Sequence, residues 1–242
     1  MRRQMKRIIL IAVTILAVTA VILTVCLLRS RTDNTENSAS DSPSGDYEQQ
    51  VELSEETIAL GSGLILTKLS EVTGNFPEDG KDEFTESMLS ATFFNDGDRT
   101  IQYASVKVTV GEQQYSFILS TLPAGKSVRV FEADKKEWEE ESGTVSAEIE
   151  SFAYFQEEPS VYEDELEITV SDGFITVKNI SGTDINKEIS VFYKTVSGDT
   201  FVGGITYRFR VPAGLAAGAE YKGNAMHASG KWSKVMFVTY GK

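Results

Sequence analysis

Residues 88–110 read MLSATFFNDGDRTIQYASVKVTV, and this stretch decides the fold that we expect. An Asn-Asp-Gly turn signal at 95–97 is followed by a segment, Val106 to Val110, in which valines alternate with polar residues. Successive side chains of a strand point to opposite faces, so this alternation predicts a strand with one buried face. Residues 173–196, GFITVKNISGTDINKEISVFYKTV, repeat the order of strand, asparagine-centred turn and strand.

The duplication extends further along both copies. A Pro-Ala-Gly motif follows a later strand in each copy, at 123–125 and at 212–214, and each copy closes with an aromatic strand, at 144–155 and 232–240. No stretch beyond the N-terminal region keeps a helical period. The sequence therefore predicts an all-β chain with two tandem antiparallel β-sandwiches of about 80–90 residues each. We place the first sandwich at residues 51–160 and the second at residues 161–242.

Residues 8–28 form an apolar segment, IILIAVTILAVTAVILTVCLL, that contains no charged side chain. At about 1.5 Å per residue, a helix of this length spans a hydrocarbon core of roughly 30 Å. Basic residues flank it, four before (Arg2, Arg3, Lys6, Arg7) and two after (Arg29, Arg31), which favours a cytoplasmic N-terminus. We expect a cytoplasmic tip (1–7), a transmembrane helix (8–28) and a disordered linker rich in Ser, Asp and Asn (29–50).

Two other interpretations of the apolar segment stay open. A cleaved signal peptide has a shorter apolar region of about 7–15 residues and small residues at its cleavage site, where this chain has Leu27-Leu28-Arg29. A lipidated Cys26 would need a small residue directly before it, and Val25 stands there. Ala17, Ala20 and Thr24 share one side of the expected helix, and such small residues let membrane helices pack closely. The alternative is a plain anchor that faces lipid.

Charge and cysteine content restrict the function classes. The net charge is −13, and residues 161–242 contain nine acidic and nine basic groups, so the excess of negative charge lies in residues 32–160. Such an acidic part argues against nucleic-acid binding. The single cysteine, Cys26, leaves the remainder without disulfides, whereas small secreted domains often depend on them.

The turns and strands resemble a known group of modules. Asn95 and Asn179 in their turns, the strand Ile189–Tyr193 leading into Ser197-Gly198-Asp199, and the Pro-Ala-Gly motifs resemble the small immunoglobulin-like modules of bacterial surface proteins, the group that contains FxLYD and CARDB domains. The resemblance covers most of residues 60–242, and the chain has no literal Phe-x-Leu-Tyr-Asp string. It implies an immunoglobulin-like sandwich fold on the cell surface. Such modules serve as spacers and binding units and share no active site.

The sequence offers few residues for catalysis or metal binding. His227 is the only histidine, and no Gly-x-Ser-x-Gly motif accompanies it. We therefore expect no enzyme activity, no metal site and no cofactor. Calcium stays open as an alternative because oxygen ligands cluster in two places, although neither matches an EF-hand loop. The two clusters are Glu78, Asp79, Asp82, Glu83 and Glu86, and Asn95, Asp96 and Asp98.

Trp232, His227, Arg208 and Arg210 lie in the charge-balanced second sandwich, and we predict that they form a ligand-binding surface. We expect a non-enzymatic, membrane-anchored extracytoplasmic binding or assembly module of the bacterial cell envelope. Its partner would be an envelope protein or a cell-wall glycan. Two alternatives are a carboxylate-dependent cell-wall glycan hydrolase and an accessory subunit of a membrane complex that acts through its helix.

Overall fold

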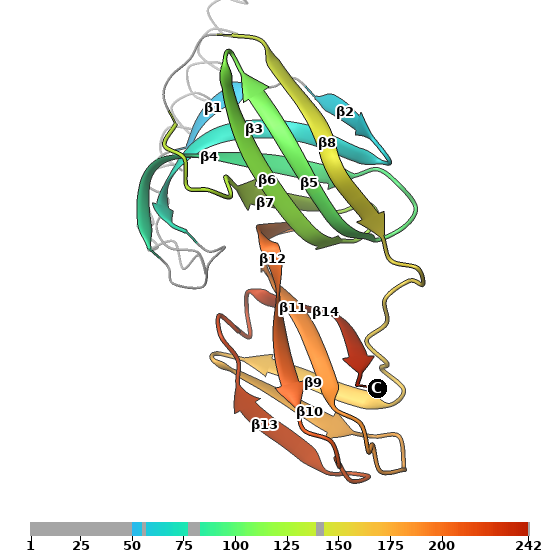
Figure 1. Cartoon of the computed structure of the whole chain (residues 1–242). Coiled ribbons are helices and arrows are strands. Elements are labelled where there is room, and N and C mark those ends of the chain that lie inside the picture. The colour runs from blue at the N-terminus through green and yellow to red at the C-terminus, as the bar shows by residue number, and fades with distance from the viewer. Residues whose placement is uncertain (1–49, 55–56, 77–82, 139–142, 242) are drawn as a thin grey trace, which may run out of the picture. The chain divides into compact units, whose positions relative to one another are not determined.

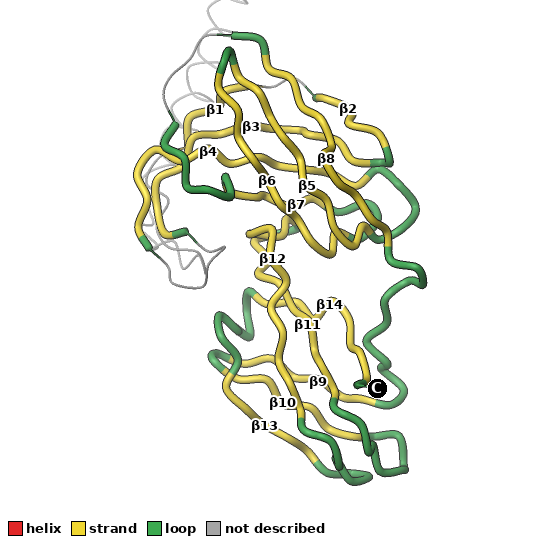
Figure 2. The backbone as a smooth tube through the Cα atoms, viewed as in Figure 1, coloured by secondary structure: helices red, strands yellow, loops and turns green. Residues whose placement is uncertain are grey.

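The computed structural model describes residues 50–54, 57–76, 83–138 and 143–241 (Figures 1 and 2). Every regular element in these ranges is a β-strand, so the expected all-β class is confirmed for them. The strands up to residue 154 are β1 (Gln50–Ser54), β2 (Ile58–Gly61), β3 (Leu64–Asn75), β4 (Phe84–Asn95), β5 (Ile101–Val110), β6 (Gln113–Leu122), β7 (Ser127–Phe131) and β8 (Val145–Tyr154). The later strands are β9 (Leu166–Ser171), β10 (Phe174–Asn179), β11 (Ile189–Ser197), β12 (Thr200–Val211), β13 (Glu220–Asn224) and β14 (Ser233–Tyr240).

Within the described ranges, no helix is long and apolar enough to cross a membrane. The expected transmembrane helix lies outside those ranges, together with Ala17, Ala20 and Thr24. The cytoplasmic tip and the linker up to residue 49 lie outside them as well. These expectations stay predictions.

One strand order occurs in two consecutive parts of the chain, which we call the first repeat (Leu64–Tyr154) and the second repeat (Leu166–Tyr240). Strands of the first repeat pair in the orders β3-β4-β7 and β6-β5-β8. Strands of the second repeat pair in the orders β9-β10-β13 and β12-β11-β14. All of these pairs are antiparallel. Six strands in each repeat thus follow one connectivity, while a domain boundary at residue 160 stays a prediction.

Each repeat has a hydrophobic core built from the inward faces of its strands. The predicted alternation holds in β5, where Val106 and Val108 are fully buried and Lys107 between them is more exposed. Burial of one such side chain contributes about 1.5–3 kcal/mol. The first core includes Leu66, Leu69, Leu89, Phe93, Val106, Val108, Phe117, Leu119, Val128 and Val130. The second core includes Ile175, Val177, Val191, Tyr193, Phe209, Val211 and Val238.

A buried asparagine closes the same turn in each repeat. Asn95 ends β4, and its Nδ2 donates hydrogen bonds to the carbonyl oxygen four residues ahead and to that of Leu122, both at 2.9 Å. Asn179 ends β10, and its Nδ2 donates to the carbonyl oxygen four residues ahead at 2.7 Å and to that of Leu215 at 3.0 Å. Both side chains are fully buried. Each asparagine therefore ties the end of one strand to a distant segment of its repeat.

The two repeats differ in the position of the distant carbonyl group that accepts the asparagine hydrogen bond. Leu122 is the last residue of β6, whereas Leu215 lies four residues beyond the end of β12 at Val211. The Pro-Ala-Gly motif at 212–214 therefore occupies an insertion that the first repeat lacks. After the insertion the turns match again, because Gly125 and Gly218 have φ angles of 67° and 76°. Their backbone N–H groups donate to the carbonyl oxygens of Asn95 at 2.8 Å and Asn179 at 2.9 Å.

A shared sheet joins the repeats. The start of β12 pairs in parallel with β7 through the partners Thr200↔Ser127, Phe201↔Val128 and Val202↔Arg129. The joined sheet follows the order β1-β3-β4-β7-β12-β11-β14, and β2 pairs with β3 (Figure 1). Alternation along β12 sends Phe201 into the first core, where it is 2% exposed. The β11–β12 hairpin of the second repeat thus completes the core of the first.

A bulge in β12 lets this hairpin reach the first repeat. The pairing of β11 with β12 moves from Tyr193↔Tyr207 to Thr195↔Val202, so four residues of β12, Gly203 to Thr206, face Lys194 alone. Such bulges bend a strand. The Nζ of Lys194 donates hydrogen bonds to three carbonyl oxygens, of Ser120 in β6 at 2.9 Å and of Gly204 and Ile205 in the bulge at 3.0 Å each. The lysine thus bonds to both repeats.

Gly204 has a packing requirement that no other residue type meets. A Cβ at this position would lie 1.8 Å from the carbonyl oxygen of Ile118, which belongs to the first repeat. The Ser120 hydroxyl donates to the Gly204 carbonyl oxygen at 2.9 Å and lies 2.8 Å from the Thr206 hydroxyl. Glycine therefore permits a backbone-to-backbone approach between β12 and β6.

Candidate ligand-binding site

A row of paired residues crosses the joined sheet from the first repeat to the second. Lys68 on β3 pairs with Thr92 on β4, Thr92 pairs with Arg129 on β7, and Arg129 pairs with Val202 on β12. Directly paired residues of neighbouring strands point to the same face of a sheet. Their strand neighbours Leu69, Phe93, Val128 and Phe201 all point into the first core. The row therefore lies on the outer face of the sheet.

A small hydrophobic cluster covers part of this outer face. It consists of Val72, Phe76, Met88, Phe131 and Val202, all buried. The Phe76 and Phe131 rings pack edge to face with centroids 6.5 Å apart. The guanidinium carbon of Arg129 lies 5.7 Å from the centroid of the Phe131 ring. Arg129 is thus held between its polar neighbours in the row and an aromatic surface.

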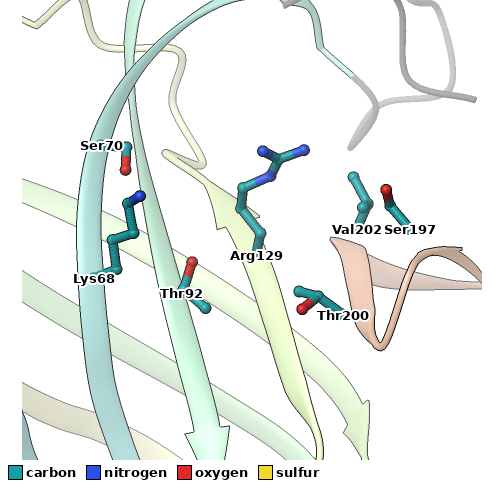
Figure 3. Close-up of a pocket in the computed structure, with 7 residues that line it drawn as sticks. All are labelled: Lys68, Ser70, Thr92, Arg129, Ser197, Thr200 and Val202. Carbon is teal, nitrogen blue, oxygen red and sulfur yellow. The ribbon is translucent and has the colours of Figure 1, made fainter. Parts of the chain in front are cut away.

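Residues of the first repeat and of the hairpin line an open cavity of about 310 Å³, which we call the junction pocket (Figure 3). In the close-up, Lys68, Thr92 and Arg129 stand on three neighbouring strands, and the hairpin residues lie beyond Arg129. Both repeats contribute to the lining, which consists of Lys68, Ser70, Thr92, Arg129, Ser197, Thr200 and Val202.

The described lining of the junction pocket is polar and rich in hydroxyl groups. Among the described side chains that line it, Lys68 and Arg129 carry a positive charge, four carry a hydroxyl group and none is acidic, and both cations already have interaction partners. The chain as a whole has a net charge of −13, so this combination runs against its composition. Guanidinium and ammonium groups donate hydrogen bonds, and hydroxyl groups both donate and accept them. The described lining suits the binding of a polar, hydroxyl-bearing molecule.

Two of the predicted ligand-binding residues, Arg208 and Arg210, lie on one face of β12. Both are exposed, and they alternate with the buried Phe209 and Val211. The Nε of Arg210 lies 3.9 Å from a carboxylate oxygen of Glu188. Burial therefore alternates along this part of the strand, and the alternation turns the two arginines away from the second core.

The other two predicted residues, His227 and Trp232, lie in the segment between β13 and β14. His227 has a φ angle of 56°, and its ring centroid is 5.2 Å from that of Tyr207. Tyr207 packs against the second core, so His227 lies on the opposite side of β12 from Arg208 and Arg210. The Lys231 Nζ is 4.2 Å from the centroid of the Trp232 ring. The structure does not gather the four residues on one face, and a ligand-binding role for them stays a prediction.

Tyr193 stands beside this segment and has an altered titration. Its ring stacks on Tyr207 with centroids 5.4 Å apart, and its hydroxyl donates a hydrogen bond to the Met226 carbonyl oxygen. Burial raises the pKa of Tyr193 to about 12, since the charged phenolate is disfavoured away from water. The neutral hydroxyl is thus the form that the folded chain favours.

The described residues contain no group of three or more His, Cys, Asp and Glu side chains that could hold a metal ion. Glu78, Asp79 and Asp82 of the first oxygen-rich cluster lie outside those residues. In the second cluster, the Asn95 Oδ1 accepts a hydrogen bond from the Gly97 N–H at 3.0 Å, so this amide serves the turn.

Sequence reasoning missed the junction pocket. Arg129 lies between two buried valines and Lys68 precedes the buried Leu69, and polar residues at such positions usually indicate a solvated strand face. Thr200 and Ser197 flank a Gly-Asp turn and resemble ordinary turn residues. The signal that was available is the Gly203-Gly204 pair directly before the alternating segment 205–211, because glycine in a strand often marks a bulge or a close backbone approach.

Comparisons with protein-family models, with curated proteins and with solved structures found no match for this chain.

Proposed function

We propose that this chain is a non-enzymatic binding or assembly module that a transmembrane helix anchors to the bacterial cell envelope. In this proposal residues 8–28 span the membrane, the N-terminus is cytoplasmic, and two immunoglobulin-like sandwiches lie outside the cell. The uncharged segment of 21 residues and its flanking basic residues support the anchor and its orientation. The ligand or partner would be an envelope protein or a cell-wall glycan.

The observation that carries the proposal is the duplicated strand order with a polar pocket where the copies meet. Each repeat places three strands in one layer and three in the other, as an immunoglobulin-like sandwich does. Binding surfaces in such folds are built from side chains and loops on a rigid scaffold. Residues of both repeats line the junction pocket, so a ligand bound there would contact both copies of the duplicated unit.

A capture experiment tests the binding role. The full-length chain with a C-terminal tag would be expressed in the source cells, cross-linked in the intact envelope and purified in detergent. We expect one envelope protein or wall glycan to co-purify, and an Arg129→Gln variant to retain much less of it than wild type. Lys187→Gln removes one positive charge at an exposed site outside both candidate surfaces and serves as the matched control. If nothing beyond background co-purifies with wild type, the binding role is wrong.

A protease experiment tests the orientation. Trypsin added to intact spheroplasts should remove the C-terminal tag while a cytoplasmic marker protein stays intact. Full protection of the tag would contradict the extracytoplasmic placement.

A further inference from the structure

We propose that the outer edge of β13 is a dimer interface, at which β13 pairs antiparallel with β13 of a second copy of this chain. The two β9-β10-β13 sheets then form one continuous sheet across a two-fold axis at Tyr221. This inference goes beyond the proposed binding role, because neither the surface nor its occupant involves the junction pocket.

The edge of β13 presents backbone groups for another strand. β13 ends the sheet order β13-β10-β9 (Figure 1), and within the described part of the chain it pairs with β10 alone. The Asn179 N–H donates to the carbonyl oxygen of Ala219, the residue before β13, at 3.0 Å. Backbone groups of successive residues point to opposite sides of a strand, so those of Glu220, Lys222 and Asn224 point outward. Such an edge can pair with another chain.

The first repeat shows a strand added at the corresponding edge. β7 has the place of β13 in the shared strand order. The Asn95 N–H donates to the carbonyl oxygen of Lys126, the residue before β7, at 3.0 Å, so the backbone groups of Ser127 and Arg129 point outward. Both residues pair with β12. The molecule thus already extends its sheet once at the position that β13 leaves at the edge.

The charges of β13 select the second copy and one register. In an antiparallel pair, outward-pointing residues of the two strands face each other. A register centred on Tyr221 places Glu220 opposite Lys222 of the partner subunit, twice by symmetry. A register centred on Glu220 or on Lys222 places like charges opposite each other, and one centred on Gly223 pairs Lys222 with the uncharged Asn224. Opposite charges across a strand pair stabilise it and like charges destabilise it, so the first register is favoured.

The outer face of the sheet already has alternating charges that this register continues. Glu167 on β9 pairs with Lys178 on β10, which pairs with Glu220 on β13. The Lys178 Nζ lies 3.5 Å from a carboxylate oxygen of Glu167. The Lys222 Nζ lies 4.8 Å from the centroid of the Phe174 ring, which keeps the ammonium group on this face. Lys222 of the partner subunit therefore becomes the fourth member of a row that reads acid, base, acid, base.

The inner face supplies an aromatic contact at the two-fold axis. Tyr221 is partly buried against the second core, and its ring centroid lies 6.0 Å from that of Phe209. In the proposed register Tyr221 faces Tyr221 of the partner subunit in a pair without backbone hydrogen bonds, where side chains lie closest. Aromatic pairs across strands stabilise a sheet. The dimer therefore covers the exposed part of Tyr221.

Cysteine cross-linking tests the register. Two differently tagged full-length chains, Glu220→Cys and Lys222→Cys, would be co-expressed in a Cys26→Ser background and oxidised mildly in the membrane. Directly opposite residues of such a pair have Cα atoms about 5.5 Å apart, within the roughly 4.4–6.8 Å that a disulfide bridges. We expect a disulfide dimer that carries both tags and little cross-linking of either variant with itself. Lys187→Cys, at an exposed lysine, is the control partner for Lys222→Cys and should not cross-link.

Two outcomes of this experiment would overturn the proposal. One is the absence of a dimer that carries both tags. The other is self cross-linking of Lys222→Cys as efficient as that of the mixed pair, because it would place the two lysines opposite each other.

Charge exchange tests the pairing. Lys222→Glu places carboxylates opposite each other at both ends of the pair, so we expect the dissociation constant of the dimer to rise about tenfold. Glu220→Lys alone should also weaken the dimer. An equimolar mixture of the two variants should recover wild-type dimerisation, because each acid then faces a base. Sedimentation equilibrium of the full-length chain in density-matched detergent measures the constant.

Lys187→Glu makes the same charge change away from β13 and should dimerise as wild type. Recovery in the mixture also shows that both variants are folded. A wild-type dimer that Lys222→Glu leaves unchanged would overturn the interface and assign dimerisation to another part of the chain. A monomer that still captures an envelope partner would overturn the dimer and leave the proposed function standing.

Discussion

At the scale of single residues, the two buried asparagines fix the most specific contacts of the fold. Asn95 and Asn179 each donate to two carbonyl groups and accept from a backbone N–H two residues ahead, at 3.0 Å in both cases. A side-chain amide is the one group that supplies two donors and an acceptor from the same short side chain. This requirement explains why the same residue type occurs at both turns.

Replacing either asparagine by alanine should therefore cost about 2–3 kcal/mol in the free energy of unfolding, since buried carbonyl groups lose their donor. Asn95→Asp keeps the accepting oxygen and loses the donating nitrogen, so we expect it to destabilise the chain as well. Urea unfolding measures the loss. Asn186→Ala, at an exposed asparagine, is the control and should stay within about 0.5 kcal/mol of wild type. A loss at Asn95 no larger than this control would contradict the assigned role.

Tyr193 makes stability depend on alkaline pH. Its pKa is about 12 in the folded chain against an ordinary value of 10, so the folded state holds the proton more tightly than the unfolded state. The contribution is complete below pH 10 and is lost as the pH rises through 12. Tyr240 acts in the same direction, because burial and its hydrogen bond to Glu165 raise its pKa.

We expect Tyr193→Phe to flatten the fall in the free energy of unfolding between pH 10 and 12. Urea unfolding across this range measures the slope, and tyrosinate absorbance should show that one late titration has disappeared. Tyr103→Phe, at an exposed tyrosine, is the control and should keep the wild-type slope. Identical slopes for wild type and Tyr193→Phe would contradict the assignment.

At the scale of elements, the β11–β12 hairpin belongs to the second repeat by sequence and to the first by packing. Phe201 is buried in the first core, whereas Phe209 on the same strand is buried in the second. One strand thus serves two cores, with the bulge between them. The tryptophans can report on each repeat separately, because Trp138 lies in the first core and Trp232 belongs to the second repeat, just before β14.

Phe201→Ala should destabilise the first core by about 3–5 kcal/mol, which is the usual cost of truncating a buried phenylalanine. We expect a shift in the unfolding curve followed by Trp138 fluorescence in a Trp232→Phe background. Phe209→Ala should instead shift the curve followed by Trp232 in a Trp138→Phe background more than the curve followed by Trp138 in the Trp232→Phe background. If Phe201→Ala moved only the Trp232 signal, the packing of the hairpin against the first repeat would be wrong.

The strands with one buried face were predictable, and the hairpin contact was not. Val106 and Val108 alternate with polar residues because only one face of β5 meets a core. Residues 201–204 are all buried, since they lie between the two repeats, and period-two alternation disappears there. A local pattern reports how many faces of a strand are buried, and it does not identify the partner strand.

At the scale of the whole molecule, Lys194 connects the repeats. It is fully buried, and its three carbonyl acceptors come from both repeats. Lys194→Met keeps most of the side-chain volume and removes the donor, so we expect a loss of about 2–4 kcal/mol. In wild type the Trp138 and Trp232 unfolding curves should coincide, and in the variant they should separate. Lys187→Met, at an exposed lysine, should leave the curves coincident, and coincident curves in Lys194→Met would contradict the coupling.

The candidate site also depends on contacts at this scale. Lys68 and Thr200 are far apart in the sequence, and only the parallel pairing of β7 with β12 brings them to one cavity. The sequence favoured Trp232, His227, Arg208 and Arg210 because aromatic and basic residues are common in binding surfaces. Strand alternation and the Tyr207 contact place the two arginines and His227 on different sides of β12. The sequence identifies residues of the types that are common in binding surfaces. It does not show which of these residues lie on the same face.

The parallel pairing of β7 with β12 also has a consequence for biosynthesis. Phe201 follows Phe131, the last residue of β7, by seventy residues. At a synthesis rate of roughly 5–20 residues per second, β7 waits on the order of several seconds for its partner strand. During this time a nascent chain exposes an unpaired strand edge beside an unfilled core, which is the kind of surface that aggregates or recruits a chaperone. A chain whose synthesis ends before residue 200 would thus contain a first repeat in which the β7 edge stays unpaired and the core lacks Phe201.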